Sequence, residues 1–473
     1  MKHTGKVVLL LLTVLMSASI GAQSGTQPDW AKVDEETMAH FQAILKLDST
    51  DPPGKEDHVV AYLKQVLEKD GIAVQTFAKE AHRPNLVARI KGTGKQRPLL
   101  IMAHTDTVNV DPKKWTHPPF GAVRDGGYVY GRGTVDDKDN VAATLMVMLM
   151  LKRQNVPLDR DVIALFEAGE EGSSSIGVQF VANEHFDAID SEFCYAEGGS
   201  VTRTGGQVKF ASVQTVEKIP RAISVTSRGV AGHGSVPLEN NALAHLGEAV
   251  GKIAAWTPPM RLNETTAAYF KRLATVSSPE DAARYRALLS PDPKISGPAD
   301  AYMRKNEPRH WSMLRTSLSP TVIGGGYRTN VIPSEGTATI DTRLAPDEDA
   351  ATLLDMVKKV VNDPQVEVSY GPRDTRPPTP PMRLDSDAFK ALESNITKHY
   401  KTVTLPTMST GATDMAFLRR KGIQCYGIGP ATDSEDGPKG YGAHSDQERI
   451  LEAELFRFVR FNWDAVVDLA RAK

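Results

Sequence analysis

Cysteine is scarce in this sequence, since only Cys194 and Cys425 occur among its 473 residues. Neither has a neighbouring cysteine at zinc-finger spacing, which excludes a structural zinc site built from thiolates. Each cysteine lies in an apolar stretch typical of a strand. This position favours two buried thiols over a disulfide, although an exported protein could form one.

Other absences exclude further classes of protein. The net charge is only −2, so the chain lacks the strong field typical of proteins that bind nucleic acid or a membrane surface. No Gly-x-Ser-x-Gly elbow follows a strand-like run, which argues against a serine hydrolase. There is no internal repeat, and the one biased tract is a proline cluster at 377–381.

The first 22 residues have the three-part pattern of a signal peptide. Lys2 and Lys6 precede an apolar run over 7–16, and small residues end the segment near Ala22. The run is short for a bilayer, and no cysteine follows it to carry a lipid anchor. We therefore expect an exported protein, periplasmic or secreted, with an uncleaved anchor as the alternative. The remaining chain is long enough for two domains.

The stretch Pro98–Asp106, which reads PLLIMAHTD, is central to the interpretation. Its unbroken apolar run predicts a strand buried on both faces of a largely parallel sheet, and helical and strand-like patterns alternate around it. Chemistry in such sheets gathers beyond the carboxyl ends of the strands. There His104 and Asp106 point the same way, which suits a metal-ligating imidazole oriented by a carboxylate. An ordinary polar strand end is the alternative.

Acidic residues follow several other strand-like or glycine-rich segments. Helix capping and solvated turns are the alternative explanations for them. Two histidines with several carboxylates and no thiolate suit a hydrolytic zinc site, and the number of acids fits two metals with one acid left as a base. The residues concerned are Asp136, Asp137, Asp139, Glu170, Glu171 and Glu197, together with His444 in HSDQE.

Seven motifs in order resemble the co-catalytic zinc hydrolases typified by acetylornithine deacetylase, succinyl-diaminopimelate desuccinylase and carboxypeptidase G, in peptidase clan MH. The resemblance is strongest to the branch of carboxypeptidase S and the N-acyl-amino-acid hydrolases. It runs from about residue 35 to the C-terminus. The motifs are AHTD, YGRGTVDDK, FEAGEEGS, AEGG, GVAGHGS, TNVIP and GAHSDQE.

The resemblance implies two Zn²⁺ ions per chain, for which Co²⁺ or Mn²⁺ could substitute. One ion would be held by His104, Asp136 and Glu197. The other would be held by Asp136, Glu171 and His444, so that Asp136 bridges the two.

The same resemblance assigns the catalytic roles. Asp106 would orient His104, and Glu170 would be the general base that accepts a proton from the attacking water. Asp139 is a departure, because the family usually has glycine at this position. It lies after the bridging acid, so it concerns the geometry of the loop rather than ligation.

The middle of the chain has its own pattern. Its β-α-β-β-α-β order predicts a ferredoxin-like α+β sandwich, which in the family is a lid inserted into an α/β catalytic domain. We expect the catalytic domain at 30–218 and 377–473, with a mixed, mostly parallel sheet sandwiched by helices, and the lid or dimerisation domain at 219–376. The stretch Thr257–Arg315 has no place in the β-α-β-β-α-β pattern and resembles the longer lid of the carboxypeptidase S branch.

Four lid residues are of interest. The family uses a histidine at the position of His233 to stabilise the oxyanion, often across a dimer, although a glycine-rich turn alone would favour a surface histidine. Asn330 and Arg376 match residues that bind substrate, and the planar fork of an arginine suits a carboxylate. Arg376 could instead pair with an acid at the hinge. Arg343 is interpreted as a structural ion-pairing residue.

Together these features indicate an exported di-zinc metallohydrolase that cleaves amide bonds of peptides or N-acyl amino acids with a free carboxylate. An aminoacylase or deacetylase acting on non-peptide substrates is the first alternative, and an aminopeptidase is less favoured. A periplasmic binding protein that kept the fold without catalysis is the alternative from another class. The intact pair Glu170 and Glu171 argues against it. A homodimer is possible on the family pattern.

Overall fold

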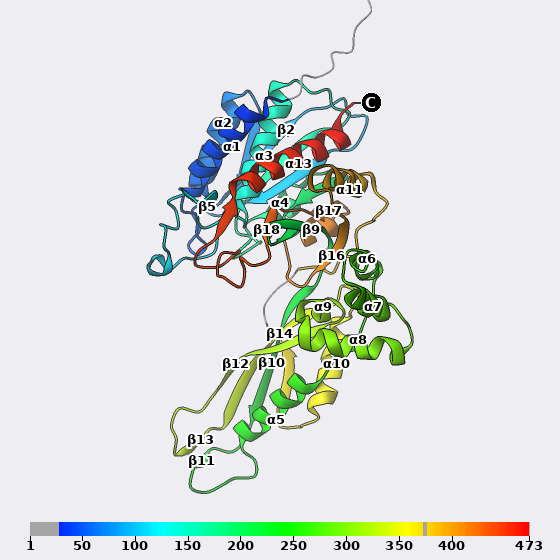
Figure 1. The fold of residues 1–473 in the computed structure, drawn as a ribbon. Helices are drawn as coiled ribbons and strands as arrows, with labels where there is room; N and C mark the ends of the chain where they lie inside the picture. The colour runs from blue at the N-terminus through cyan, green and yellow to red at the C-terminus, as the bar shows by residue number, and fades with distance from the viewer. Residues whose placement is uncertain (1–27, 372–375, 473) are drawn as a thin grey trace, which may run out of the picture.

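The computed structural model describes residues 28–371 and 376–472, so the predicted signal peptide lies outside the described residues. Most of this chain forms a ten-stranded sheet with helices on both faces (Figure 1). The strand order is β1-β2-β6-β3-β7-β17-β9-β8-β18, with β16 paired to β9. The strands are β1 (Val74–Ala78), β2 (Pro84–Ile90), β3 (Leu99–His104), β6 (Val162–Glu167), β7 (Phe193–Ala196), β8 (Ser200–Thr204), β9 (Gln207–Glu217), β16 (Thr404–Ser409), β17 (Gln424–Gly427) and β18 (Ala431–Asp433).

The sheet is parallel at its centre and contains antiparallel pairs toward both edges. β3 lies between β6 and β7 and is parallel to both, and β17 continues the parallel set beside β7. β1 pairs antiparallel with β2, and β8 pairs antiparallel with β9. Every residue of β3 and of β6 is buried, as their continuous apolar runs predict. The predicted mixed α/β architecture is thus confirmed.

Helices cover the two faces of this sheet unequally. α3 is apolar on all sides and almost wholly buried, because α1 and α13 pack over it. Cys194 and Cys425 lie opposite each other on β7 and β17, and both are buried and free. One face carries α1 (Trp30–Leu45), α2 (Glu56–Lys69), α3 (Lys138–Arg153), α11 (Asp387–Tyr400) and α13 (Glu452–Ala470), and the other carries α4 (Val178–Glu184) and α12 (Met415–Arg420).

A second, four-stranded antiparallel sheet has the order β12-β14-β10-β15. With its helices it follows the predicted β-α-β-β-α-β order, and Leu246, Ile253 and Leu353 lie in the core between helices and sheet. Figure 1 shows it as a separate layer beyond one end of the large sheet. Its elements are β10 (Ile219–Arg228), α5 (Ala242–Ala255), β12 (Ser317–Gly325), β14 (Glu335–Leu344), α10 (Ala350–Val361) and β15 (Val366–Tyr370).

Two small sheets complete the strand pairing. β11 (Gly232–His233) pairs with β13 (Val331–Ile332), and this ribbon lies at the end of the second sheet that points away from the large sheet (Figure 1). The other comprises β4 (Val123–Asp125), β5 (Tyr128–Tyr130) and β19 (Arg449–Leu451). None of the described helices is long and apolar enough to cross a membrane.

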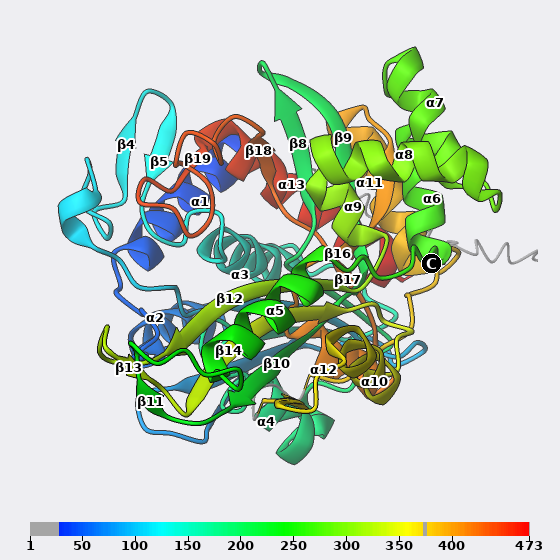
Figure 2. The same cartoon turned by 90° about the horizontal axis from the view of Figure 1, so that it is seen from below.

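The stretch Thr257–Arg315 folds into four helices that pack on the large sheet. Phe270 is fully buried in one cluster with Val216 of β9 and Leu405 of β16. Figure 2 shows these helices beside β16 and β9. They are α6 (Glu264–Leu273), α7 (Pro279–Leu288), α8 (Pro293–Asn306) and α9 (Pro308–Met313). By its packing this segment therefore covers the large sheet, whereas the sequence associated it with the lid.

Candidate metal centre

The acidic segments converge at the carboxyl ends of the central strands. His104 is the last residue of β3. Glu170 and Glu171 follow β6, and Glu197 follows β7, the two strands that flank β3. Because parallel strands end at the same edge, the three loops meet there. Asp136 lies just before α3, whose first turn therefore faces the same edge.

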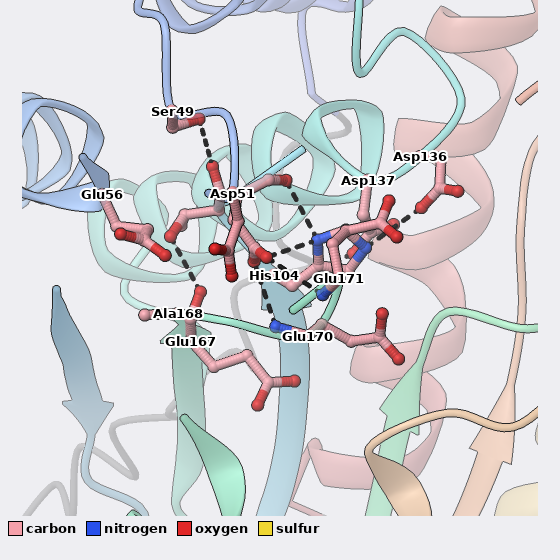
Figure 3. Close-up of polar contacts among 12 residues, drawn as sticks. Ser49, Asp51, Glu56, His104, Asp136, Asp137, Glu167, Ala168, Glu170 and Glu171 are labelled. Atoms are coloured by element: carbon pink, nitrogen blue, oxygen red, sulfur yellow. Dashed lines mark hydrogen bonds and ion pairs between the residues drawn. The ribbon is translucent and has the colours of Figure 1, made fainter. Parts of the chain in front are cut away.

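Asp136 lies between two histidines. One of its carboxylate oxygens is 3.0 Å from His104 Nε2, and the other is 3.0 Å from His444 Nε2. His444 Nε2 is also 3.0 Å from Glu171 Oε1. Figure 3 shows Asp136 next to His104, with Glu171 on the same side. This is the arrangement expected of a bridging carboxylate, with one imidazole on each side.

Glu170 and Glu197 complete the cluster. Ligand atoms of His104, Glu170 and Glu197 lie within 4.8 Å of one another, as do those of His104, Asp136 and Glu171. The cluster opens into a cavity of about 450 Å³, called here the metal cavity. Its lining comprises Asp136, Glu170, Glu171, Glu197, Gly198, Gln214, Arg343, Arg376, Ser409, Gly411, Ala412, Thr413 and His444.

Asp106 connects the histidine to the glutamate loop. Its two carboxylate oxygens accept hydrogen bonds from the backbone N–H groups of Glu170 and Glu171, at 3.2 and 3.0 Å. One of them is also 3.5 Å from His104 Nδ1. Asp137, which is buried, accepts the backbone N–H of His104 at 3.1 Å. Asp106 thus contacts the loop of Glu170 and Glu171 as well as the imidazole of His104. Its spacing from His104 in the sequence did not indicate the contact with the glutamate loop.

The donor set suits a divalent metal. It offers two imidazoles and several carboxylates, and no thiolate contributes among the grouped residues. Burial raises the pKa of Glu170 and of Glu197 well above the usual range, and neighbouring carboxylates raise both further. Hydrogen bonds to Asp136 and Glu171 raise the pKa of His444 to about 10. Crowded acids of this kind need a compensating cation.

Asp139 lies buried in the first turn of α3. Burial, and then the charge of Asp137, raise its pKa well above the usual range. A carboxyl in this environment favours its neutral form. Both of its carboxylate oxygens are buried without a hydrogen-bond partner among the described residues, so the departure from glycine places a desolvated acid beside Asp137.

Two arginines reach the metal cavity, one of which the sequence did not indicate. Arg376 lies 3.5 Å from Glu170 Oε1 and 3.2 Å from Asp414 Oδ1. Arg343 pairs with Asp341 at 3.1 Å, as expected of an ion-pairing residue, but it also lines the cavity. Asp385 pairs instead with Arg383, and Asp374 lies outside the described residues. The one sequence feature that could have indicated a role for Arg343 at the cavity is its position near the end of a predicted lid strand.

His233 and Asn330 lie away from this cavity. Both are exposed and neighbour each other on the β11–β13 ribbon, where Gly234 N donates to the carbonyl oxygen of Asn330 at 2.8 Å. The ribbon is at the end of the second sheet that is remote from the large sheet (Figure 1). In this conformation a single chain does not bring either residue to its own metal cavity.

Glu448, which ends the motif GAHSDQE, connects the loop before Asp136 with the loop that carries His444. It is fully buried and accepts hydrogen bonds from the backbone N–H groups of Gly133 and Val135, just before Asp136. It also pairs with Arg132 at 2.6 Å, and Arg132 donates to the backbone carbonyl of Ser445, next to His444. Burial raises the pKa of Glu448 to about 7. It is a positioning residue that sequence reasoning missed.

A mixed α/β sheet with imidazole and carboxylate ligands gathered at its carboxyl edge defines a metal-binding hydrolase. More specifically, the chain belongs to peptidase family M20/M25/M40, whose model matches residues 100–466. The resemblance inferred from the motifs is thereby confirmed.

Individual relatives include both peptidases and acylases. The chain is 31% identical to a probable carboxypeptidase S-like 2 of Dictyostelium discoideum over 340 residues, which cover 70% of this chain and 64% of that protein. It is 26% identical to aminoacylase-1A of Rattus norvegicus, with coverage of 92% and 96%. The fold is similar to that of an M20 metallo-carboxypeptidase, Sso-CP2, from Sulfolobus solfataricus, with a TM-score of 0.68, 21% identity and coverage of 92% and 99%. The chain thus spans less than two thirds of the carboxypeptidase S-like protein's own length.

We expect metal-free protein to bind about two zinc ions per chain and to release protons as it does so. Because hydrogen bonds to Asp136 and Glu171 raise the pKa of His444 to about 10, we expect this imidazole to hold a proton at pH 7 and to lose it when it ligates a metal. Titration calorimetry in buffers of different ionisation enthalpy measures both quantities. Binding of a single ion, or binding with no proton change, would contradict the assignment of His444.

Glu448→Gln should weaken metal binding about 10–100-fold, the usual cost of losing a group that orients a metal ligand. The loops that carry Asp136 and His444 lose their common carboxylate anchor, and the buried Arg132 loses its charged partner. Competition with a chelator measures the affinity, and activity should return at saturating metal. Glu452→Gln is the matched control, because Glu452 pairs with Arg124 near the surface. Equal effects of both substitutions would refute a positioning role.

Proposed function

We propose that this protein is an exported di-zinc amidohydrolase that cleaves peptides or N-acyl amino acids carrying a free carboxylate, in the manner of a carboxypeptidase or dipeptidase. The main support is the position of Asp136, with one oxygen 3.0 Å from each of His104 and His444. A carboxylate shared in this way fits two metal ions held side by side. Export, to the periplasm or outside the cell, rests on the signal-peptide pattern of the first 22 residues.

When bound, the two metal ions would polarise the substrate carbonyl and lower the pKa of the attacking water. Glu170 accepts a proton from that water and delivers it to the leaving amine. It can do so because Glu171 is directed to His444, whereas Glu170 lines the cavity beside Glu197. Asp106 holds both glutamates in register through their backbone N–H groups. The intact base favours an enzyme over a binding protein of the same fold.

Two guanidinium groups support a substrate with a free carboxylate. Arg343 and Arg376 both line the metal cavity, although Arg376 also pairs with Asp414. A planar guanidinium binds a carboxylate with two parallel hydrogen bonds. The names of two relatives, a carboxypeptidase S-like protein and an aminoacylase, are both consistent with a substrate of this kind. An aminoacylase acting on non-peptide N-acyl substrates therefore remains the second candidate.

A homodimer would supply the remaining lid residues. His233 and Asn330 lie on the ribbon remote from their own metal cavity, so a second copy is the simplest source of these groups at each site. β12 is an edge strand of the second sheet, and its Val322 and Ile323 are 62% and 65% exposed. An exposed apolar edge strand suits pairing with another copy.

Glu170→Gln should retain both metals and lose about 10²–10⁴-fold in kcat, the range for general acid–base catalysis. Glu171→Gln should instead lose metal, because its carboxylate is the one beside His444. Hydrolysis of an N-acyl amino acid and elemental analysis compare the two variants, and chelation of the wild type should abolish turnover until zinc or cobalt is restored. Full activity of a demonstrably metal-free preparation would refute the proposed function.

Removing the substrate carboxylate should lower kcat/KM at least about tenfold, since charge-assisted hydrogen bonds contribute roughly 1.5–3 kcal/mol. The comparison is between an N-acyl amino acid and its amide. Arg343→Ala and Arg376→Ala should each reduce this preference. Arg228→Ala is the control, as Arg228 forms exposed ion pairs on a lid strand. If the wild type cleaves both compounds equally, an aminopeptidase or endopeptidase is favoured.

Mixing His233→Ala with Glu170→Gln should restore part of the lost activity if His233 acts across a dimer. Each hybrid dimer then contains one site with both groups intact. Its activity should therefore be at most about half of that of a wild-type dimer. Activity and light scattering of the mixture measure the effect. A fully active monomer at all concentrations would remove the cross-subunit role.

A further inference from the structure

A second cavity, of about 480 Å³, lies along strands that also line the metal cavity. Its volume lies within the range of about 300–1,000 Å³ that is usual for sites of small molecules. Part of its wall belongs to the helical stretch Thr257–Arg315, which the proposed function does not otherwise use. The lining comprises Ser200, Thr202, Phe210, Ser212, Tyr269, Glu307, Pro308, Arg309, His310, Met313, Thr407, Thr432 and Ser434.

The two cavities share one face of the large sheet. On β9, Gln214 lines the metal cavity, and Ser212 and Phe210 line the second cavity. On β16, Ser409 lines the first and Thr407 the second. Residues two apart on a strand point to the same face, so each strand leads from one cavity directly into the other. Gly198, followed by Ser200 and Thr202 of β8, repeats this pattern.

Strand pairing aligns these residues into rows across the sheet. Ser200 is directly opposite Ser212, and Thr202 is directly opposite Thr432 of β18. Thr407 is opposite Gln214, at the junction of the two cavities. The floor of the second cavity is therefore a set of small hydroxyl side chains, called here the hydroxyl floor. It consists of Ser200, Thr202, Ser212, Thr407 and Thr432.

Helices α6 and α9 form the wall above this floor. Tyr269 and Met313 are buried there and contribute apolar surface, together with Phe210 from β9. The acidic group of the wall, Glu307, already has hydrogen-bond partners. Glu307 accepts hydrogen bonds from His310 and from the Tyr285 hydroxyl. Arg309 is exposed at the rim.

We propose that the second cavity binds the peptide chain on the amino-terminal side of the scissile bond. The acyl group that the enzyme removes from the terminal amino acid is then itself a peptidyl group of two or more residues. This assignment rests on the proposed function. It makes the protein a carboxypeptidase of short peptides in preference to a deacetylase of small N-acyl groups.

The spacing of the floor matches this ligand. Side chains two apart on a strand recur about every 6.6–6.8 Å, which is also the repeat of an extended peptide backbone. A strand residue and its next-but-one neighbour can therefore hydrogen-bond amide groups two residues apart in a bound extended peptide. The path from Gln214 to Phe210 spans four residues, or about 13 Å, enough for several substrate residues.

Charge gives the direction of binding. The guanidinium groups of Arg343 and Arg376 line the metal cavity, so the substrate carboxylate remains there. The floor of the second cavity carries no charged side chain, the acid of its wall is already paired, and Arg309 lies exposed at the rim, so the floor itself suits uncharged amide groups. A hydroxyl floor is a poor match for a long alkyl chain, because its hydroxyl groups would lose water without gaining partners.

The experiment compares three substrates with the same C-terminal residue: an N-acetyl amino acid, an N-acetyl tetrapeptide and an N-dodecanoyl amino acid. We expect the tetrapeptide to have a kcat/KM at least about tenfold above that of the N-acetyl amino acid. Thr202→Val keeps the side-chain shape but removes a hydroxyl, and should reduce the tetrapeptide advantage about two- to tenfold. Ser212→Phe, which fills part of the second cavity, should reduce the tetrapeptide advantage further.

Matched controls are Thr337→Val on β14 and Ser369→Phe on β15 of the second sheet, which should leave the ratio unchanged. A wild type that cleaves the N-acetyl amino acid at least as well as the tetrapeptide would overturn the peptide subsite while leaving the proposed amidohydrolase intact. The peptide subsite would also be overturned if the kcat/KM of the dodecanoyl substrate equalled that of the tetrapeptide and did not change in Thr202→Val. Failure to cleave any of the three by metal-loaded enzyme would refute both the subsite and the proposed function.

Discussion

The concentration of carboxylates at one sheet edge is the constraint on which the site depends. Glu170 and Glu197 are desolvated beside Asp136 and Glu171, and burial disfavours their charged forms. Hydrogen bonds to Asp136 and to other carboxylates raise the pKa of both His104 and His444, which favours their protonated forms beside the acids. Divalent cations would replace those protons, which links metal binding to the protonation of the whole cluster.

Two further buried carboxylates hold the ligand loops by accepting backbone hydrogen bonds. Asp106 accepts hydrogen bonds from the N–H groups of Glu170 and Glu171, and Glu448 accepts them from N–H groups just before Asp136. Charged acceptors of this kind form stronger hydrogen bonds than neutral ones. The candidate ligand residues are thereby held by backbone hydrogen bonds of their loops and not only by contacts of their side chains.

The second sheet and the helical segment divide the remaining tasks. The second sheet extends away from the metal centre and exposes an apolar edge at Val322 and Ile323, whereas α6 to α9 fold back onto β9 and β16. Figure 2 shows the helical segment beside β9 and β16, whose residues Gln214 and Ser409 line the metal cavity. The segment that interrupts the ferredoxin-like pattern is thus part of the wall next to the proposed catalytic site.

Local sequence pattern determined a large part of the fold and of the ligand set. The runs that became β3 and β6 are apolar throughout because both their faces are covered, and the apolar helix α3 is buried on all sides for the same reason. His104, Asp136 and Glu171 were recognisable because each stands in a motif directly after or before a buried element. Residues close together on one strand, or at the start of one helix, keep in the folded protein the spacing that the sequence gives them.

What only the tertiary structure decided concerns residues far apart in the chain. The proximity of Arg343 to the metal cavity, the anchoring of two loops by Glu448 and the packing of Phe270 on β16 all join segments that no local pattern connects. His233 and Asn330 illustrate the reverse case, because their motifs indicated a site that their own chain does not bring to them. Local propensity encodes which element forms, whereas long-range packing decides which faces meet, since burial is a property of the assembled layers and not of a single segment.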